Sequence, residues 1–87
     1  MNILFTSSFE KRFKKLDSRI KKITLAKIEF FKDDPLHPSL RIHSLKGELR
    51  GFCSISINDN YRIIFNRKNN GNIIFHFIGK HDVYKNL

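Results

Sequence analysis

The sequence predicts an α+β fold in which two N-terminal helices pack on one face of a mostly antiparallel sheet, in the order β-α-α-β-β-β-β. Three apolar runs between residues 49 and 84 alternate with a period of two, which is typical of strands. Polar turns at residues 58–60 (NDN) and 69–71 (NNG) separate these runs, as expected of tight hairpins in a meander. Ahead of the meander, apolar residues recur at helical spacing, and two such helices bury their apolar faces against one side of the sheet.

Each strand of the meander presents apolar residues at alternate positions. These residues are Cys53, Ile55 and Ile57, then Tyr61, Ile63 and Phe65, and finally Ile73, Phe75 and Phe77. A short apolar run at residues 2–6 (NILFT) predicts an extended strand that joins the same sheet. Residues 40–45 predict a weaker, irregular strand, because apolar and polar positions alternate poorly there.

Two N-cap signals predict two helices rather than one long helix. Ser7, with Glu10 three positions later, has the pattern of a capping box that begins a helix. Asp17-Ser18 offers the second N-cap signal. The second helix is expected to end at residues 33–35 (DDP), because proline cannot continue the hydrogen-bond ladder.

The core is expected to lie between these helices and the sheet. The first helix presents Phe9, Phe13 and Leu16 on one face, and the predicted buried face of the second helix contains Ile20, Ile23, Ala26 and Phe30, widened by Leu25, Ile28 and Phe31. The side chains expected to be buried are Phe13, Ile23, Phe30, Ile55, Ile63 and Phe75. A small domain buries a smaller fraction of its surface on folding than a large one, so each of these large side chains is expected to matter for stability.

The composition indicates a basic protein with a charged partner. The 87 residues are expected to form a single domain, residues 1–87. The formal net charge is +9, from 17 Lys and Arg against 8 Asp and Glu. Folding needs no such excess, so it favours nucleic acid, an acidic protein or an anionic surface as partner. A single cysteine excludes an internal disulfide and favours a reducing cytoplasm, and no apolar run is long enough for a membrane span or resembles a signal peptide.

His81 is the strongest candidate for chemistry among the four histidines. It follows the last predicted strand beside Lys80, and an imidazole next to a cation suits proton transfer at an RNA phosphate, although a structural role remains open. His43, at a strand-to-turn element, is equally open to a structural or a catalytic role. His37 is more simply a loop residue, and His76 a packed or surface residue of a strand.

Other features of the sequence are less specific. The basic face of the first helix, which includes Lys11 and Lys15, is either a solvated face or a contact surface for phosphates or an acidic partner. No metal site is expected, because the histidines lack the short spacing of metal ligands. No cofactor is expected either, because the sequence has no glycine-rich phosphate loop.

Four short stretches together resemble a known family. They are residues 43–47 (HSLKG), 51–52 (GF), 60–65 (NYRIIF) and 78–84 (IGKHDVY). These stretches are similar to the RelE/ParE superfamily of type II toxin–antitoxin toxins, and most similar to its RelE, YoeB and YafQ branch. The resemblance covers nearly the whole chain, because the order of elements is also that of the family, and it implies the RelE-like microbial RNase fold.

The resemblance also implies a function and a set of site residues. It implies a ribosome-dependent endoribonuclease that cuts mRNA in the ribosomal A site, contacts 16S rRNA and is silenced by a cognate acidic antitoxin, with no membrane partner and no small-molecule cofactor. It places Arg62 at the scissile phosphate, His81 at the catalytic position after the last strand and Tyr84 just beyond it. His43 falls at the position of the candidate general base. Lys46 and Arg50 lie where basic residues of the family hold the RNA backbone, and Lys80, Lys11 and Lys15 are also expected to bind RNA.

The same residues fit metal-independent RNA cleavage by the RNA's own 2′-hydroxyl. That reaction needs a base, a cation for the developing phosphorane charge and an acid for the departing 5′-oxygen, which His43, Arg62 and His81 can supply in that order. Tyr84 is suited to stacking on a base or orienting the phosphate. The alternative functions are a ParE-like protein that inhibits DNA gyrase by binding, without catalysis, and a basic RNA-binding module without toxicity.

The chain also departs from its relatives at three positions. Ser56 and Asn60 stand where YafQ has His and Asp, and Phe52 stands where the family often has tryptophan. A protein that only binds its target has no need of Arg62, His81 and Tyr84 together. These three residues therefore favour the nuclease over the two alternatives without catalysis.

Overall fold

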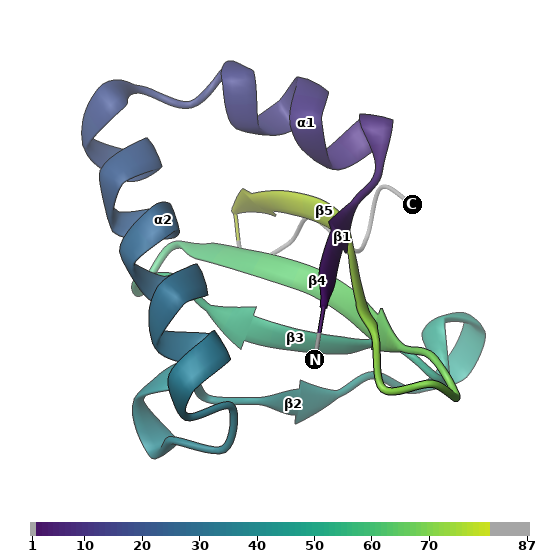
Figure 1. Ribbon diagram of the computed structural model, residues 1–87. Helices are drawn as coiled ribbons and strands as arrows, with labels where there is room; N and C mark the ends of the chain where they lie inside the picture. Colours follow the sequence, from purple (N-terminus) through teal and green to yellow (C-terminus); the bar gives the residue numbers. More distant parts are fainter. Residues whose placement is uncertain (1, 81–87) are drawn as a thin grey trace.

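The computed structural model describes residues 2–80 and confirms the predicted α+β fold. Both helices lie against one face of a five-stranded sheet (Figure 1). The elements are β1 (Ile3–Phe5), α1 (Ser7–Lys14), α2 (Ser18–Asp33), β2 (His43–Ser44), β3 (Cys53–Ser56), β4 (Tyr61–Arg67) and β5 (Ile73–Lys80). Two short 3-10 turns, η1 (Pro38–Leu40) and η2 (Gly47–Leu49), flank β2.

The sheet is mixed, with the strand order β1-β5-β4-β3-β2. β1 runs parallel to β5, whereas every other neighbouring pair is antiparallel, as predicted for a mostly antiparallel sheet. Ile63 on β4 pairs with Ile55 on β3 and with Ile78 on β5. All three side chains belong to the core, so this register brings the apolar residues of three strands together on the face that the helices cover.

Two irregularities interrupt the sheet. β2 is shorter than the strand predicted over residues 40–45, because η1 ends at Leu40 and Arg41 has a φ of 49°, a left-handed conformation that breaks an extended strand. On β5, the pairing with β4 shifts: Ile64 opposes Phe77, but the next residue of β4 opposes Phe75. His76 is therefore the extra residue of a β-bulge.

Thr6, rather than the predicted Ser7, caps α1. Thr6 Oγ1 accepts a hydrogen bond from the backbone N–H of Phe9 at 3.1 Å and donates one to the carbonyl oxygen of His76 at 3.0 Å. A hydroxyl can do both, so this side chain ties the start of the helix to the bulge in β5. The sequence pattern placed the cap one residue too late. The bond from Thr6 Oγ1 to the carbonyl oxygen of His76 favours Thr6, and it depends on a strand near the other end of the chain.

Asp17 separates the two helices as predicted. Its Oδ1 accepts a hydrogen bond from the backbone N–H of Ile20 at 2.9 Å, which caps α2. α2 then ends at Asp33, close to the predicted stop before Pro35. Within residues 2–80, neither helix combines the length and the apolar character needed to cross a bilayer.

α2 is rotated relative to the predicted orientation, and the prediction that Phe30 is buried is wrong. The buried residues of α2 are Ile20, Thr24, Ile28 and Phe31. Phe30 is 39% exposed and packs edge-on against His37, with 4.8 Å between the ring centroids. Phe31 instead reaches the sheet, where its ring lies 5.4 Å from that of Phe65. Leu25 and Ala26 are exposed as a consequence of the same rotation.

Phe75 lies at the centre of the aromatic core. Its ring centroid is 5.8 Å from that of Phe9, 5.9 Å from that of Phe31 and 6.0 Å from that of Phe65, distances at which aromatic rings attract one another. The predicted burial of Ile55, Ile63 and Phe75 is confirmed. Phe13 and Ile23 are only half-buried and pack against the edge of this core.

We expect Phe31→Ala to lower the free energy of unfolding by about 3–5 kcal/mol, because it empties a fully buried aromatic site. Phe30→Ala, one position away on α2, is the matched control and should cost much less, since the Phe30 side chain is partly in solvent. Urea unfolding followed by circular dichroism measures both losses. Equal losses for the two variants would contradict the orientation of α2.

Candidate functional site

The face of the sheet away from the helices carries polar side chains that the register brings together. Directly opposed residues of an antiparallel pair point to the same side of the sheet. Ser56 opposes Arg62 in the pairing of β3 with β4. Ser54 opposes Ile64 on one side and His43 on the other. The edge strand β2 and the central strand β4 therefore contribute side chains to one surface.

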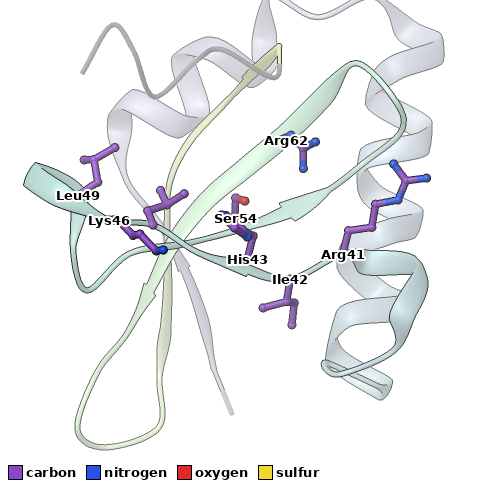
Figure 2. Close-up of a pocket in the computed structure, with 8 residues that line it drawn as sticks. Arg41, Ile42, His43, Lys46, Leu49, Ser54 and Arg62 are labelled. Carbon is purple, nitrogen blue, oxygen red and sulfur yellow. The ribbon is translucent and has the colours of Figure 1, made fainter.

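These side chains line an open cavity of about 630 Å³. The lining residues are Arg41, Ile42, His43, Leu45, Lys46, Leu49, Ser54 and Arg62. Three of the residues proposed from the sequence thus line one cavity: His43 from β2, Lys46 from the cap of η2 and Arg62 from β4. Figure 2 shows His43 beside Ser54, with Arg62 reaching in from β4 and Lys46 from the segment before η2.

A neutral hydroxyl orients the guanidinium of Arg62. Arg62 Nη1 donates a hydrogen bond to Ser56 Oγ at 3.1 Å, and Ser56 is buried. The contact fixes the direction of the side chain without neutralising its charge. A preorganised cation of this kind suits an anion that arrives from solvent.

The electrostatic character of the cavity is positive. Arg41, Lys46 and Arg62 all line it, and within residues 2–80 no lining residue carries a carboxylate. Arg41 pairs with Asp59, whose Oδ1 lies 3.7 Å from Arg41 Nη1, with both side chains largely exposed. Exposed ion pairs contribute little stability, so the pair leaves Arg41 free to exchange Asp59 for another anion.

The other proposed residues lie elsewhere. Arg50 follows η2 and is exposed but does not line the cavity, and Lys11 and Lys15 are exposed at α1. Lys80 lines a separate cavity of about 420 Å³ beside the N-terminus of α2. His81 and Tyr84 lie outside the described residues, and their roles stay predictions from the sequence.

Several residues of the site, Arg41 and Ser56 among them, were not proposed from the sequence. Arg41 had one signal, because it lies two positions before His43 on a stretch expected to be extended. Ser56 was noted only as a departure from a relative, since its bond to Arg62 depends on the pairing register of β3 and β4.

The remaining histidines have structural contacts. His37 Nδ1 accepts a hydrogen bond from the backbone N–H of Ser39 at 3.1 Å and so caps η1. His76 packs in the sheet, where burial lowers its pKa and the neighbouring charge of Lys68 lowers it further. Within residues 2–80, no group of three or more His, Cys, Asp or Glu side chains is placed to hold a metal ion.

Comparisons with known proteins agree on the fold. A family model described as the RelE-like toxin of the type II toxin–antitoxin system HigB matches residues 5–81. No match is found among the curated proteins. The structure is similar to that of YafQ from Escherichia coli, with a TM-score of 0.78 and 16% identity over 95% of this chain and 96% of that chain.

Two further solved structures have the same fold. A YoeB/ParE toxin from Agrobacterium tumefaciens matches with a TM-score of 0.75 and 19% identity over 93% of this chain and 99% of that chain. A YoeB–YefM complex from Staphylococcus aureus matches with a TM-score of 0.73 and 20% identity over 93% of this chain and 97% of that chain. At these identities the likeness establishes the fold alone.

The lowered pKa of His76 has a consequence for stability below neutral pH. An unfolded histidine titrates near about 6.5, so between that value and the lower folded pKa the unfolded chain binds more protons. Stability from this group is therefore complete above about pH 6.5 and declines as the pH falls through the folded pKa. We expect the free energy of unfolding of His76→Gln to fall less steeply below neutral pH than that of the wild type. Parallel slopes in urea titrations at several pH values would count against this.

Proposed function

Because the chain belongs to the HigB-like family of RelE-like toxins from type II toxin–antitoxin systems, we propose that it is a ribosome-dependent endoribonuclease that cuts mRNA. The observation that carries the proposal is the cavity of about 630 Å³, which a histidine and three cations line and where none of the described lining residues is acidic. Such a cavity suits a substrate with a phosphate backbone. The imidazole of His43 in its lining adds a group suited to proton transfer.

The reaction we propose is attack by a 2′-hydroxyl on the phosphorus that follows it in the RNA. A base removes the hydroxyl proton, the new O–P bond forms as the bond to the 5′-oxygen breaks, and that oxygen takes up a proton. The products are a 2′,3′-cyclic phosphate and a free 5′-hydroxyl. No water and no outside reactant enters this step, so the protein has to supply only proton transfer and charge stabilisation.

His43 and Arg62 take the two roles that lie inside the cavity. His43 acts as the base, a contribution of about 10²–10⁴-fold for a positioned group. Arg62, held by Ser56, stabilises the negative charge that develops on the phosphate oxygens. Lys46 and Arg41 hold neighbouring phosphates of the chain. We assign protonation of the leaving oxygen to His81 and base stacking to Tyr84, on the resemblance alone.

The proposed site has few groups that can take part in catalysis, and we therefore expect its activity to need the ribosome. His43 is exposed, and the described lining offers one imidazole and three cations. That set stabilises charge but does little to bend RNA into the in-line geometry that the attack requires. A ribosome that holds the mRNA in such a geometry supplies positioning, which is worth several kcal/mol of the barrier.

An acidic antitoxin is the second partner that we propose. A type II system pairs its toxin with a protein antitoxin, and one structural neighbour of this chain is a YoeB–YefM complex. The net charge of +9 favours an acidic segment that folds on binding and covers the positive cavity. Antitoxin and RNA then compete for the same charges.

The test is to incubate the purified protein with one mRNA, either free or on programmed ribosomes, at matched salt concentration. We expect cuts only on the ribosome, and none when the nucleotide before the cut lacks its 2′-hydroxyl. Primer extension locates the 5′ ends, and addition of the cognate antitoxin should abolish the cuts.

Equal cleavage of free and ribosome-bound mRNA would refute ribosome dependence. Cleavage that survives removal of the 2′-hydroxyl would refute the mechanism. Intact mRNA in both tubes, together with blocked DNA supercoiling in a gyrase assay, would favour the gyrase-inhibiting alternative instead.

A further inference from the structure

The face of the sheet away from the helices also carries polar side chains near the hairpin between β4 and β5. Side chains alternate along a strand, so Asn66 lies on the same face as Arg62, four residues further along β4. At about 3.3 Å per residue the separation is roughly 13 Å. There Asn66 Oδ1 lies 2.8 Å from His76 Nε2. The ring of Phe52 meets the ring of His76 edge-on, with 5.1 Å between centroids.

Backbone contacts already hold this corner in place. The carbonyl oxygen of His76 accepts a hydrogen bond from Thr6 Oγ1 at 3.0 Å, and the carbonyl oxygen of Phe52 accepts one from the backbone N–H of Leu45 at 3.0 Å. The side chains of Phe52, Asn66 and His76 are each half-buried, so part of every one of them faces solvent. Their exposed parts are therefore accessible to a ligand while the rest of each side chain is held by the fold.

Phe52, Asn66 and His76 form a cluster, and its polar atoms have defined roles as donors and acceptors. Asn66 Oδ1 can only accept, so the proton of the imidazole is on His76 Nε2. Burial and Lys68 lower the pKa of His76, so the ring is neutral at neutral pH and Nδ1 is an acceptor. No hydrogen bond within residues 2–80 engages His76 Nδ1 or the amide nitrogen of Asn66. One donor and one acceptor are thus available to an incoming group.

The cluster combines the three kinds of contact that single-stranded RNA needs. An aromatic ring offers a stacking surface, an amide and an imidazole offer hydrogen bonds to a base edge, and an exposed cation, Lys68, offers a contact for phosphate. The cluster lies on the same face of β4 as Arg62 in the cavity, with the buried side chain of Ile64 between them.

We propose that Phe52, Asn66 and His76, with Lys68 at their edge, form a nucleobase subsite that reads an mRNA base flanking the scissile phosphate. The inference rests on the proposed function and deepens it, since it assigns to this chain the residues that set its sequence preference. Phe52 stacks on the base, Asn66 and His76 bond to its edge, and Lys68 contacts the adjoining phosphate.

The experiment measures the affinity of purified protein for short single-stranded RNAs by fluorescence anisotropy. Each RNA carries a 2′-deoxy nucleotide at the cut position, so it cannot be cleaved, and four versions differ only in one flanking base. We expect the wild type to discriminate among the four. Phe52→Leu should weaken binding by roughly tenfold, because it removes the stacking ring while keeping an apolar side chain. Asn66→Asp should change the order of preference, because a donor becomes an acceptor.

The controls separate this subsite from general effects. Phe30→Leu alters the matched phenylalanine–histidine pair on the helical side, Phe30 with His37, and should change neither affinity nor preference. Lys68→Met, at an exposed position, should reduce the slope of log affinity against log salt by about 0.7. Thermal melts confirm that each variant is folded.

Unchanged affinity and base preference in folded Phe52→Leu and Asn66→Asp would overturn the subsite, as would an unchanged salt slope in Lys68→Met. The binding assay needs no cleavage. If wild-type protein discriminates among the RNAs but leaves mRNA on ribosomes intact, the proposed nuclease function fails while the subsite stands.

Discussion

The alternation of side chains along β4 is the constraint on which both the core and the candidate site depend. On one side of this central strand, Ile63 and Phe65 pack in the core beneath the helices. On the other side, Arg62 and Asn66 face the open surface. A slip of one residue in the pairing would exchange the two sets, burying a guanidinium and exposing the core. The geometry of the site is thus as stable as the core that fixes the register.

The contacts of Arg62 and Arg41 keep the positive charge of the cavity available to a ligand. Arg62 is oriented by the hydroxyl of Ser56 rather than by a carboxylate, and the counter-ion of Arg41 is exposed. Neither contact neutralises the cavity, so its charge remains available to a phosphate or to an acidic segment. Excess like charge works against the compact state. The fold tolerates it here because the aromatic core around Phe75 lies on the opposite side of the sheet.

The sequence predicted the parts of this structure that local patterns determine, and the family match confirms the resemblance to the RelE/ParE superfamily. The order of elements and the cap at Asp17 depend on neighbours a few residues away, and both are confirmed. The choice between Phe30 and Phe31 is not local, because either fits helical spacing and only contact with the sheet decides between them. The bond from Arg62 to Ser56 likewise needs the strand register.

The central claim of this account is that Arg62 stabilises charge at the cleaved phosphate. Its most direct test is the single-turnover rate of mRNA cleavage on programmed ribosomes for Arg62→Ala, with Arg67→Ala, an exposed arginine at the end of the same strand, as the matched control. The account expects a fall of about 10²–10³-fold for the first variant and little change for the second, with both proteins folded. An Arg62→Ala protein that is folded and cuts at the wild-type rate would contradict it.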